Sequence, residues 1–173
     1  PSITIPDTVR WIGDYAFKWC YALTEVRLPK ALTAINAYVF EDCTQLTSVT
    51  LQENIEVIGN GAFDGCTALE SVNIPEGVTA IGDAAFYRCR GLTSVTIPDS
   101  VTEIGYSAFG NCSGLTELNL GAGLKVLGRY AFSGCKRIKE LYIPGAVGEV
   151  PFGLACNCVS LQRVTLGEGI TYI

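Results

Sequence analysis

The stretch IPDSVTEIGYSAFGNCSGLTELN, residues 97–119, is one unit of a pattern that fills the whole chain. Its cysteine recurs every 23 residues in seven copies: Cys20, Cys43, Cys66, Cys89, Cys112, Cys135 and Cys158. A phenylalanine precedes each of the first six cysteines by three residues, and a leucine or isoleucine follows all seven by three. Strict self-similarity at such a period is typical of a solenoid, in which each repeat contacts only its neighbours.

The repeats predict a single domain. The 173 residues hold about seven and a half units without insertion or linker, so residues 1–173 are predicted to form one continuous array. Both ends fall inside a repeat and neither has the polar character of a capping repeat, so we interpret the chain as a fragment of a longer protein. No apolar run reaches the length of a membrane span, which argues against membrane insertion by this segment.

Each repeat predicts a strand followed by a turn and a short helical segment. Residues 115–120 alternate apolar and polar side chains, as a half-buried strand does. Gly105 stands where five other repeats carry glycine or asparagine, which predicts a tight turn with a positive φ angle. Ala108, Phe109 and Cys112 have the spacing of one helical turn.

The motif Leu-x-x-Val-x-Ile-Pro-x-x-Val-x-x-Ile-Gly-x-x-Ala-Phe-x-x-Cys-x-x is complete between Leu92 and Cys112 and resembles the BspA-like leucine-rich repeats. The resemblance covers the whole chain. It implies a leucine-rich-repeat solenoid with a parallel β-sheet, one strand per repeat, on the concave side and turns with short helical segments on the convex side. Members of that family are surface proteins of host-associated bacteria and some protist parasites. The resemblance therefore implies a cell-surface or secreted location and an adhesion or host-interaction role.

The cysteines are interpreted as packing residues. One cysteine per repeat lacks the clustered spacing of disulfide frameworks and zinc sites, and cysteine is among the most often buried residues. A ladder of buried free thiols is therefore predicted, although neighbouring rungs lie close enough for a disulfide. The seventh repeat breaks the pattern, because Pro151 replaces the turn glycine and an extra Cys156 appears at a position predicted to be exposed. We expect local distortion between Val150 and Cys158.

Composition excludes much catalytic chemistry. The chain has no histidine, which removes Ser-His-Asp and Cys-His catalysis and every His-ligated metal site. No phosphate-loop spacing is present, so no enzyme activity, metal or cofactor is predicted. The net charge of −5 argues against nucleic acid. Eight carboxylates and no basic residue lie between Lys30 and Arg88, whereas five basic residues gather between Lys125 and Lys139. This distribution fits either a solvated surface or a polarised one that orients a partner.

Two columns of outward strand residues form the first candidate binding surface, because a solenoid presents such positions as a regular grid. Their centre is small and polar, which suits a carbohydrate or an extended peptide but also suits any exposed strand. The first column runs Glu25, Ser48, Ser71, Ser94, Glu117, Glu140 and Arg163, and the second runs Arg27, Thr50, Asn73, Thr96, Asn119, Tyr142 and Thr165.

Aromatic residues of the first repeat form the second candidate. Both tryptophans of the chain, Trp11 and Trp19, lie there with Tyr15 and Tyr21, and Tyr38 joins them from the next repeat. None of them occupies a predicted core position. Exposed aromatics mark interfaces, and they also cover the end of a stack, so both interpretations stay open.

The function predicted from these observations is a non-enzymatic binding module of a secreted or surface-anchored bacterial protein. Its ligand would be a protein or a carbohydrate on host or neighbouring cells. A structural stalk or spacer is the alternative, as is an accessory domain beside a hydrolase in the same polypeptide.

Overall fold

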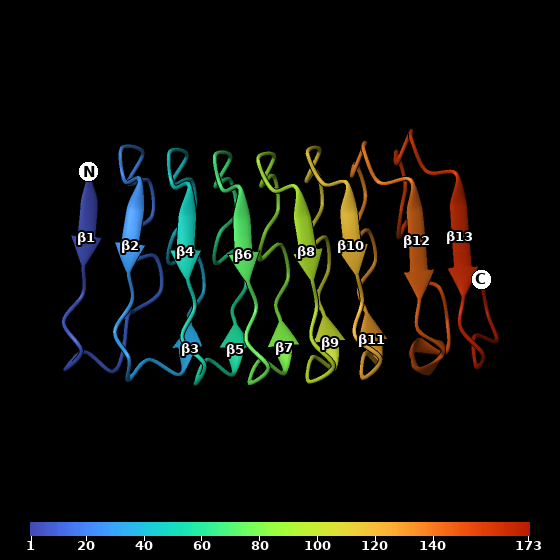
Figure 1. Cartoon of the computed structure of the whole chain (residues 1–173), viewed down its shortest axis with the longest axis horizontal. Helices are drawn as coiled ribbons and strands as arrows, with labels where there is room; N and C mark the ends of the chain where they lie inside the picture. The colour runs from blue at the N-terminus through green and yellow to red at the C-terminus, as the bar shows by residue number, and fades with distance from the viewer.

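The computed structural model describes residues 1–173 as a single row of stacked repeats, with one 23-residue repeat per turn (Figure 1). Eight main strands lie side by side and point the same way, which confirms the predicted solenoid with a parallel sheet. They are β1 (Ser2–Thr4), β2 (Glu25–Arg27), β4 (Ser48–Thr50), β6 (Ser71–Asn73), β8 (Ser94–Thr96), β10 (Glu117–Asn119), β12 (Glu140–Ile143) and β13 (Arg163–Leu166).

The repeat length sets the strand register. Every paired residue is 23 positions from its partner, as in Ile3 with Val26 and Val49 with Val72. Ladder hydrogen bonds join β1-β2-β4-β6, β8-β10 and β12-β13, and contacts between β6 and β8 and between β10 and β12 continue the row. Because the period of side-chain direction is two, this register places the same side chain of every repeat on the same face.

A second row of short strands, which the sequence did not predict, runs along the lower edge of the molecule in Figure 1. These strands pair in parallel in the order β11-β9-β7-β5-β3. Each is two residues long, too short for alternation to show in the sequence. One residue of each strand is buried and the other faces outward. The strands are β3 (Ala34–Ile35), β5 (Val57–Ile58), β7 (Ala80–Ile81), β9 (Glu103–Ile104) and β11 (Val126–Leu127).

The predicted helical segment is wrong, because successive turns take its place. In the fourth repeat the N–H groups of Ala84, Phe86 and Arg88 donate to carbonyls of the following repeat, while those between them close turns locally. A helix would need every N–H for its own i−4 carbonyl. The only helical residues form the 3₁₀ turn η1 (Gly145–Val147) in the seventh repeat.

Two residues of every repeat adopt positive φ angles in these turns, most of them without being glycine. They are Tyr15, Tyr38, Gly61, Ala84, Ser107, Tyr130 and Gly153 in one column, and Trp19, Asp42, Gly65, Arg88, Asn111, Gly134 and Asn157 in the other. Glycine occupies these positions where a side chain of the previous repeat already fills the space: a Cβ on Gly61 would overlap the ring of Tyr38. The stacking of the repeats therefore imposes the left-handed backbone. Whether the residue at such a position is glycine depends on whether a side chain of the previous repeat occupies the space of its Cβ.

The recurring turn glycine has a different role from the one predicted. Gly105 does not have a positive φ angle. A Cβ there would lie 2.7 Å from the backbone carbon of Gly82, so glycine is used for close approach of successive repeats. In the second repeat Asn36 takes this position, and its amide nitrogen donates to the Ile12 carbonyl oxygen at 2.6 Å.

One continuous core runs along the axis of the row. The rings of Phe40, Phe63, Phe86 and Phe109 are fully buried and stack with centroids 5.1–5.5 Å apart. The stack ends at Phe132, beyond which Ala155 replaces the aromatic. The seventh repeat is thus the irregular one, although its positive φ angles at Gly153 and Asn157 keep the common register.

Candidate functional site

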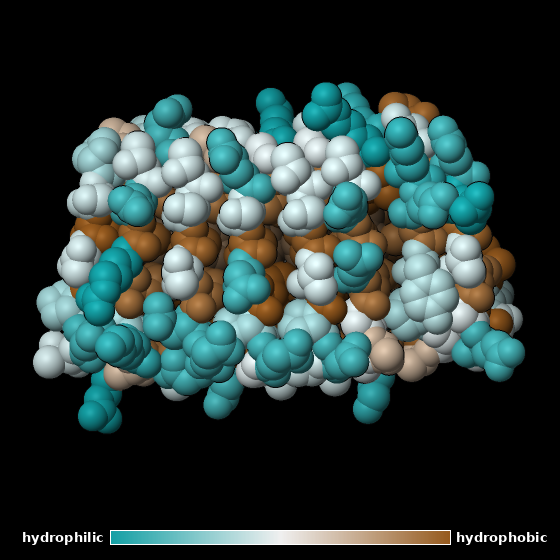
Figure 2. All heavy atoms as spheres, in the orientation of Figure 1, coloured by the Kyte–Doolittle hydropathy of each residue, from teal (hydrophilic) through white to brown (hydrophobic).

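The outward residues of the main strands form a continuous exposed grid. In each central strand the middle residue is buried and its two neighbours are exposed, as in Glu25–Val26–Arg27 and Glu117–Leu118–Asn119. Figure 2 shows this face, where small and polar side chains stand in columns and apolar atoms show between them. The structure therefore places eight of the predicted binding residues on one surface: Glu25, Arg27, Asn73, Glu117, Asn119, Glu140, Tyr142 and Arg163.

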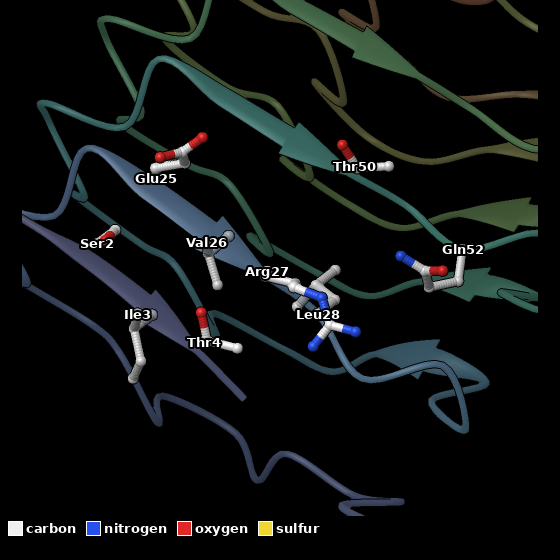
Figure 3. A pocket seen from close by; sticks show the side chains of 9 residues that line it. All are labelled: Ser2, Ile3, Thr4, Glu25, Val26, Arg27, Leu28, Thr50 and Gln52. Atoms are coloured by element: carbon white, nitrogen blue, oxygen red, sulfur yellow. The ribbon is translucent and has the colours of Figure 1, made fainter. Parts of the chain in front are cut away.

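A groove of about 440 Å³ lies at the β1 end of this surface (Figure 3). Arg27 and Glu25 contribute its charged groups, and Thr4, Thr50 and Gln52 contribute hydroxyl and amide groups. The Arg27 guanidinium donates to the Asp7 carboxylate at 3.2 Å. The backbone N–H of Lys30 and the Arg27 guanidinium lower the pKa of Asp7, so its carboxylate stays ionised at neutral pH.

A second groove of about 370 Å³ lies at the other end of the same surface, over β10 and β12. Four of the predicted residues line it, together with Thr116 and Lys139: Glu117, Asn119, Glu140 and Tyr142. Arg163, on the next strand β13, donates to the Glu140 carboxylate at 2.8 Å. Between the two grooves only small residues and Asn73 project, so the grid is low in its centre and charged at both ends.

The aromatic residues of the first repeat divide into two places. Tyr15 and Tyr38 stack with centroids 5.0 Å apart, and the Lys18 ammonium lies 4.6 Å from the Trp19 ring centre. Lys18 also forms an ion pair with the Glu41 carboxylate at 2.7 Å, and this carboxylate raises the pKa of Lys18.

Trp11 takes no part in these contacts. It is 69% exposed and occupies the position of Ala34 one repeat earlier, beside the second row of strands. The structure thus does not bring Trp11 and Trp19 together as one site.

The periodic cysteines are free and point into the core. Each thiol from Cys43 onward donates to the carbonyl oxygen of the phenylalanine 26 residues earlier, as Cys89 does to Phe63 at 3.2 Å. Burial raises the pKa of Cys112 to about 12. The buried thiols from Cys43 to Cys135 are therefore protonated packing groups, whereas Cys156 is exposed as predicted.

An ion cluster on the turn side was missed at the sequence level. Arg88 donates to Asp64 at 3.0 Å and reaches Asp42 at 3.5 Å, so one cation links carboxylates of two earlier repeats. Burial raises the pKa of Asp64, and Arg88 opposes that rise. The sequence signal was partial: Asp42 and Arg88 hold the same position two repeats apart, and Asp64 stands one residue before Gly65, which holds that position in the repeat between them.

The structure offers no group of three or more cysteine, aspartate or glutamate side chains placed to hold a metal ion. None of its elements is a helix with the length and hydropathy needed to cross a bilayer.

Comparison with known proteins identifies the family. The profile of the BspA type leucine rich repeat region matches in six copies over residues 1–113 and 79–173. A search of curated protein sequences gave no match. A leucine-rich repeat protein from Bacteroides ovatus superposes with a TM-score of 0.92 at 29% identity, covering 99% of this chain and 47% of that one. The present chain thus spans about half the length of that relative.

Two further solved structures share the fold. The T. pallidum leucine rich repeat protein has a TM-score of 0.79 at 28% identity, over 96% of this chain and 74% of that one. A leucine-rich repeat protein from Eubacterium ventriosum has a TM-score of 0.71 at 24% identity, over 96% and 48%. The chain is a leucine-rich-repeat solenoid and belongs to the BspA-type leucine-rich repeat family.

Proposed function

We propose that the chain is a non-enzymatic binding module of a secreted or surface-exposed bacterial protein, and that its main sheet binds a linear polysaccharide along the row of repeats. The observation that carries this proposal is the grid of outward residues, with a groove at each end. The family match supports the proposal, because stacked repeats present an extended surface on which a ligand can bind.

The spacing of the grid favours a glycan over a peptide. Successive strands are about 4.8 Å apart, which is close to the length of one pyranose unit in a linear glycan. An extended peptide advances about 3.3 Å per residue, so its side chains fall out of step with the rungs. A polysaccharide lying across the strands can therefore repeat the same contacts from rung to rung.

The chemistry of the grid fits the same ligand. Serine, threonine and asparagine hydroxyl and amide groups donate to and accept from sugar hydroxyls. Tyr142 is half exposed at the edge of the second groove and offers a ring face for stacking on a sugar. From Arg27 on β2 to Asn119 on β10 there are four strand spacings, or about 19 Å, so a ligand that fills both grooves has several sugar units.

Calorimetric titration with linear neutral and acidic oligosaccharides of increasing length tests this proposal. We expect affinity to rise with length until both grooves are filled. Replacing Tyr142 or Asn73 by alanine should weaken binding, while Tyr106→Ala should leave it unchanged. Tyr106 is the matched control, because it is also about half exposed but lies on the turn side. Equal binding by all three variants, or binding that an extended peptide reproduces, would contradict the proposal.

A further inference from the structure

The outward surface of the second row of strands carries charged side chains that form no ion pair within the chain. We call it the second-strand face and define it by two columns with 23-residue spacing. The first column is Arg10, Thr33, Glu56, Thr79, Thr102, Lys125, Gly148 and Thr171, and the second is Trp11, Ala34, Val57, Ala80, Glu103, Val126, Glu149 and Tyr172. Glu56 and Lys125 are both exposed, and neither belongs to any of the ion pairs of the structure.

Two of the three charges of the first column, Glu56 and Lys125, are related by a twofold axis, whereas Arg10 falls opposite Thr171. Glu56 and Lys125 are three repeats apart, or about 14 Å, with Thr79 and Thr102 between them. An axis perpendicular to the row that passes between these two threonines exchanges the positions of Glu56 and Lys125. A second copy placed by this axis would set the partner's Lys125 opposite Glu56 and the partner's Glu56 opposite Lys125, as an isologous interface requires.

The same axis also matches the apolar residues of the second column. Val57 and Val126 are 39% and 52% exposed, and the axis sets each of them opposite the other in the second copy. Trp11 and Tyr172 are each 69% exposed, and they are exchanged in the same way. The same twofold axis therefore forms two ion pairs and two valine contacts, and it places an aromatic pair at each end of the face.

A similar charge pattern elsewhere lacks this agreement. Glu70 and Lys139 are also three repeats apart, at the edge of the main sheet. The corresponding axis would set Ser71 opposite the partner's Glu140 and Asn73 opposite the partner's Tyr142, so no two exposed apolar side chains would face each other. The second-strand face is thus the one where charge and apolar surface agree.

We propose that the second-strand face binds a second copy of this chain, in an antiparallel dimer with twofold symmetry. Stable interfaces bury about 800 Å² per partner, and a face two residues wide offers less. The dimer is therefore weak and depends on ionic strength, because its ion pairs are at the surface. The columns of the main sheet take no part in the contact, so both copies keep that surface free.

Sedimentation equilibrium of the 173-residue chain at low and at high ionic strength tests the dimer. We expect reversible association at low ionic strength that weakens with added salt. Glu56→Lys and Lys125→Glu each turn both ion pairs into like-charge contacts, and each should raise the dimer dissociation constant roughly tenfold or more. The double variant Glu56→Lys/Lys125→Glu should associate as the unmodified chain does, because the swap restores both pairs.

Mixing the two single variants gives the sharpest measurement. Each variant repels itself, but in a one-to-one mixture the introduced lysine of one chain would face the introduced glutamate of the other. The unaltered Lys125 and Glu56 would face each other as well, so a heterodimer should form.

Glu70→Lys and Lys139→Glu are the matched controls, and they should leave association unchanged. A chain that stays monomeric at millimolar concentration and low ionic strength overturns the proposal. So does a mixture that associates no better than its components, or association controlled by Glu70 and Lys139.

Discussion

Replacing Phe86 by alanine is expected to lower the free energy of unfolding by about 3–5 kcal/mol. Phe86 is fully buried, and its ring stacks on Phe63 at 5.3 Å and on Phe109 at 5.1 Å. Alanine removes the ring from both contacts and leaves a cavity between two repeats. The neighbouring rings are held by their own stacks and cannot move in to fill it, so the loss should fall in the upper part of that range.

Phe17→Ala is the matched control. Phe17 holds the same position in the first repeat, but it is only partly buried and stacks on one ring, that of Phe40 at 5.5 Å. With one stacking partner and less burial, its replacement should cost about 2 kcal/mol. The predicted difference between two identical substitutions thus comes from position in the stack alone.

Urea unfolding followed by two signals measures both losses. Far-ultraviolet circular dichroism reports the whole array, whereas fluorescence reports the first repeat, because Trp11 and Trp19 are the only tryptophans. In an array stabilised by nearest-neighbour contacts, weakening the centre should separate the two transitions. Equal losses for the two variants, or a loss below about 2 kcal/mol for Phe86→Ala, would refute the stacking argument.

Three other outcomes are expected. A thiol reagent should label Cys156 first and the periodic cysteines more slowly, since five of these are buried and two are partly buried; labelling in denaturant gives the total count. Arg88→Ala should lower the free energy of unfolding more at neutral pH than below the ordinary carboxyl pKa. Burial raises the pKa of Asp64, so the ionised Asp64 is costly once its partner Arg88 is removed, whereas protonated Asp64 is not; unfolding at both pH values measures the difference. Ala84→Gly should stabilise by up to about 1 kcal/mol by relieving a positive φ angle, whereas Ala85→Gly, which is buried with an ordinary φ, should destabilise by about 1 kcal/mol in thermal unfolding.

Most of the solenoid could be predicted because repetition is written directly in the sequence. Once the cysteines gave the period, the alternation in residues 115–120 identified the main strand and its buried side. The turns could not be predicted in the same way. Ala108, Phe109 and Cys112 have helical spacing, yet the N–H groups of Ser107, Phe109 and Asn111 donate to carbonyls of the following repeat, and no local pattern reports such contacts.

The candidate site was predictable in outline only. The columns containing Arg27 and Tyr142 followed from the strand register, and the structure places both on one exposed surface. The pairing of Arg27 with Asp7 and the separation of Trp11 from Trp19 did not follow, because they depend on side-chain directions across the stack.

The sequence by itself determined the period, the strand register and the buried residues, because a 23-residue repeat places identical positions above one another. The tertiary structure decided what each position does. Gly105 serves the close approach of the preceding repeat, the periodic thiols donate to phenylalanine carbonyls, and Glu56 and Lys125 share an outward face. The physical reason is that every one of these roles is set by a neighbour 23 or more residues away, whose distance and direction exist only after the repeats have stacked.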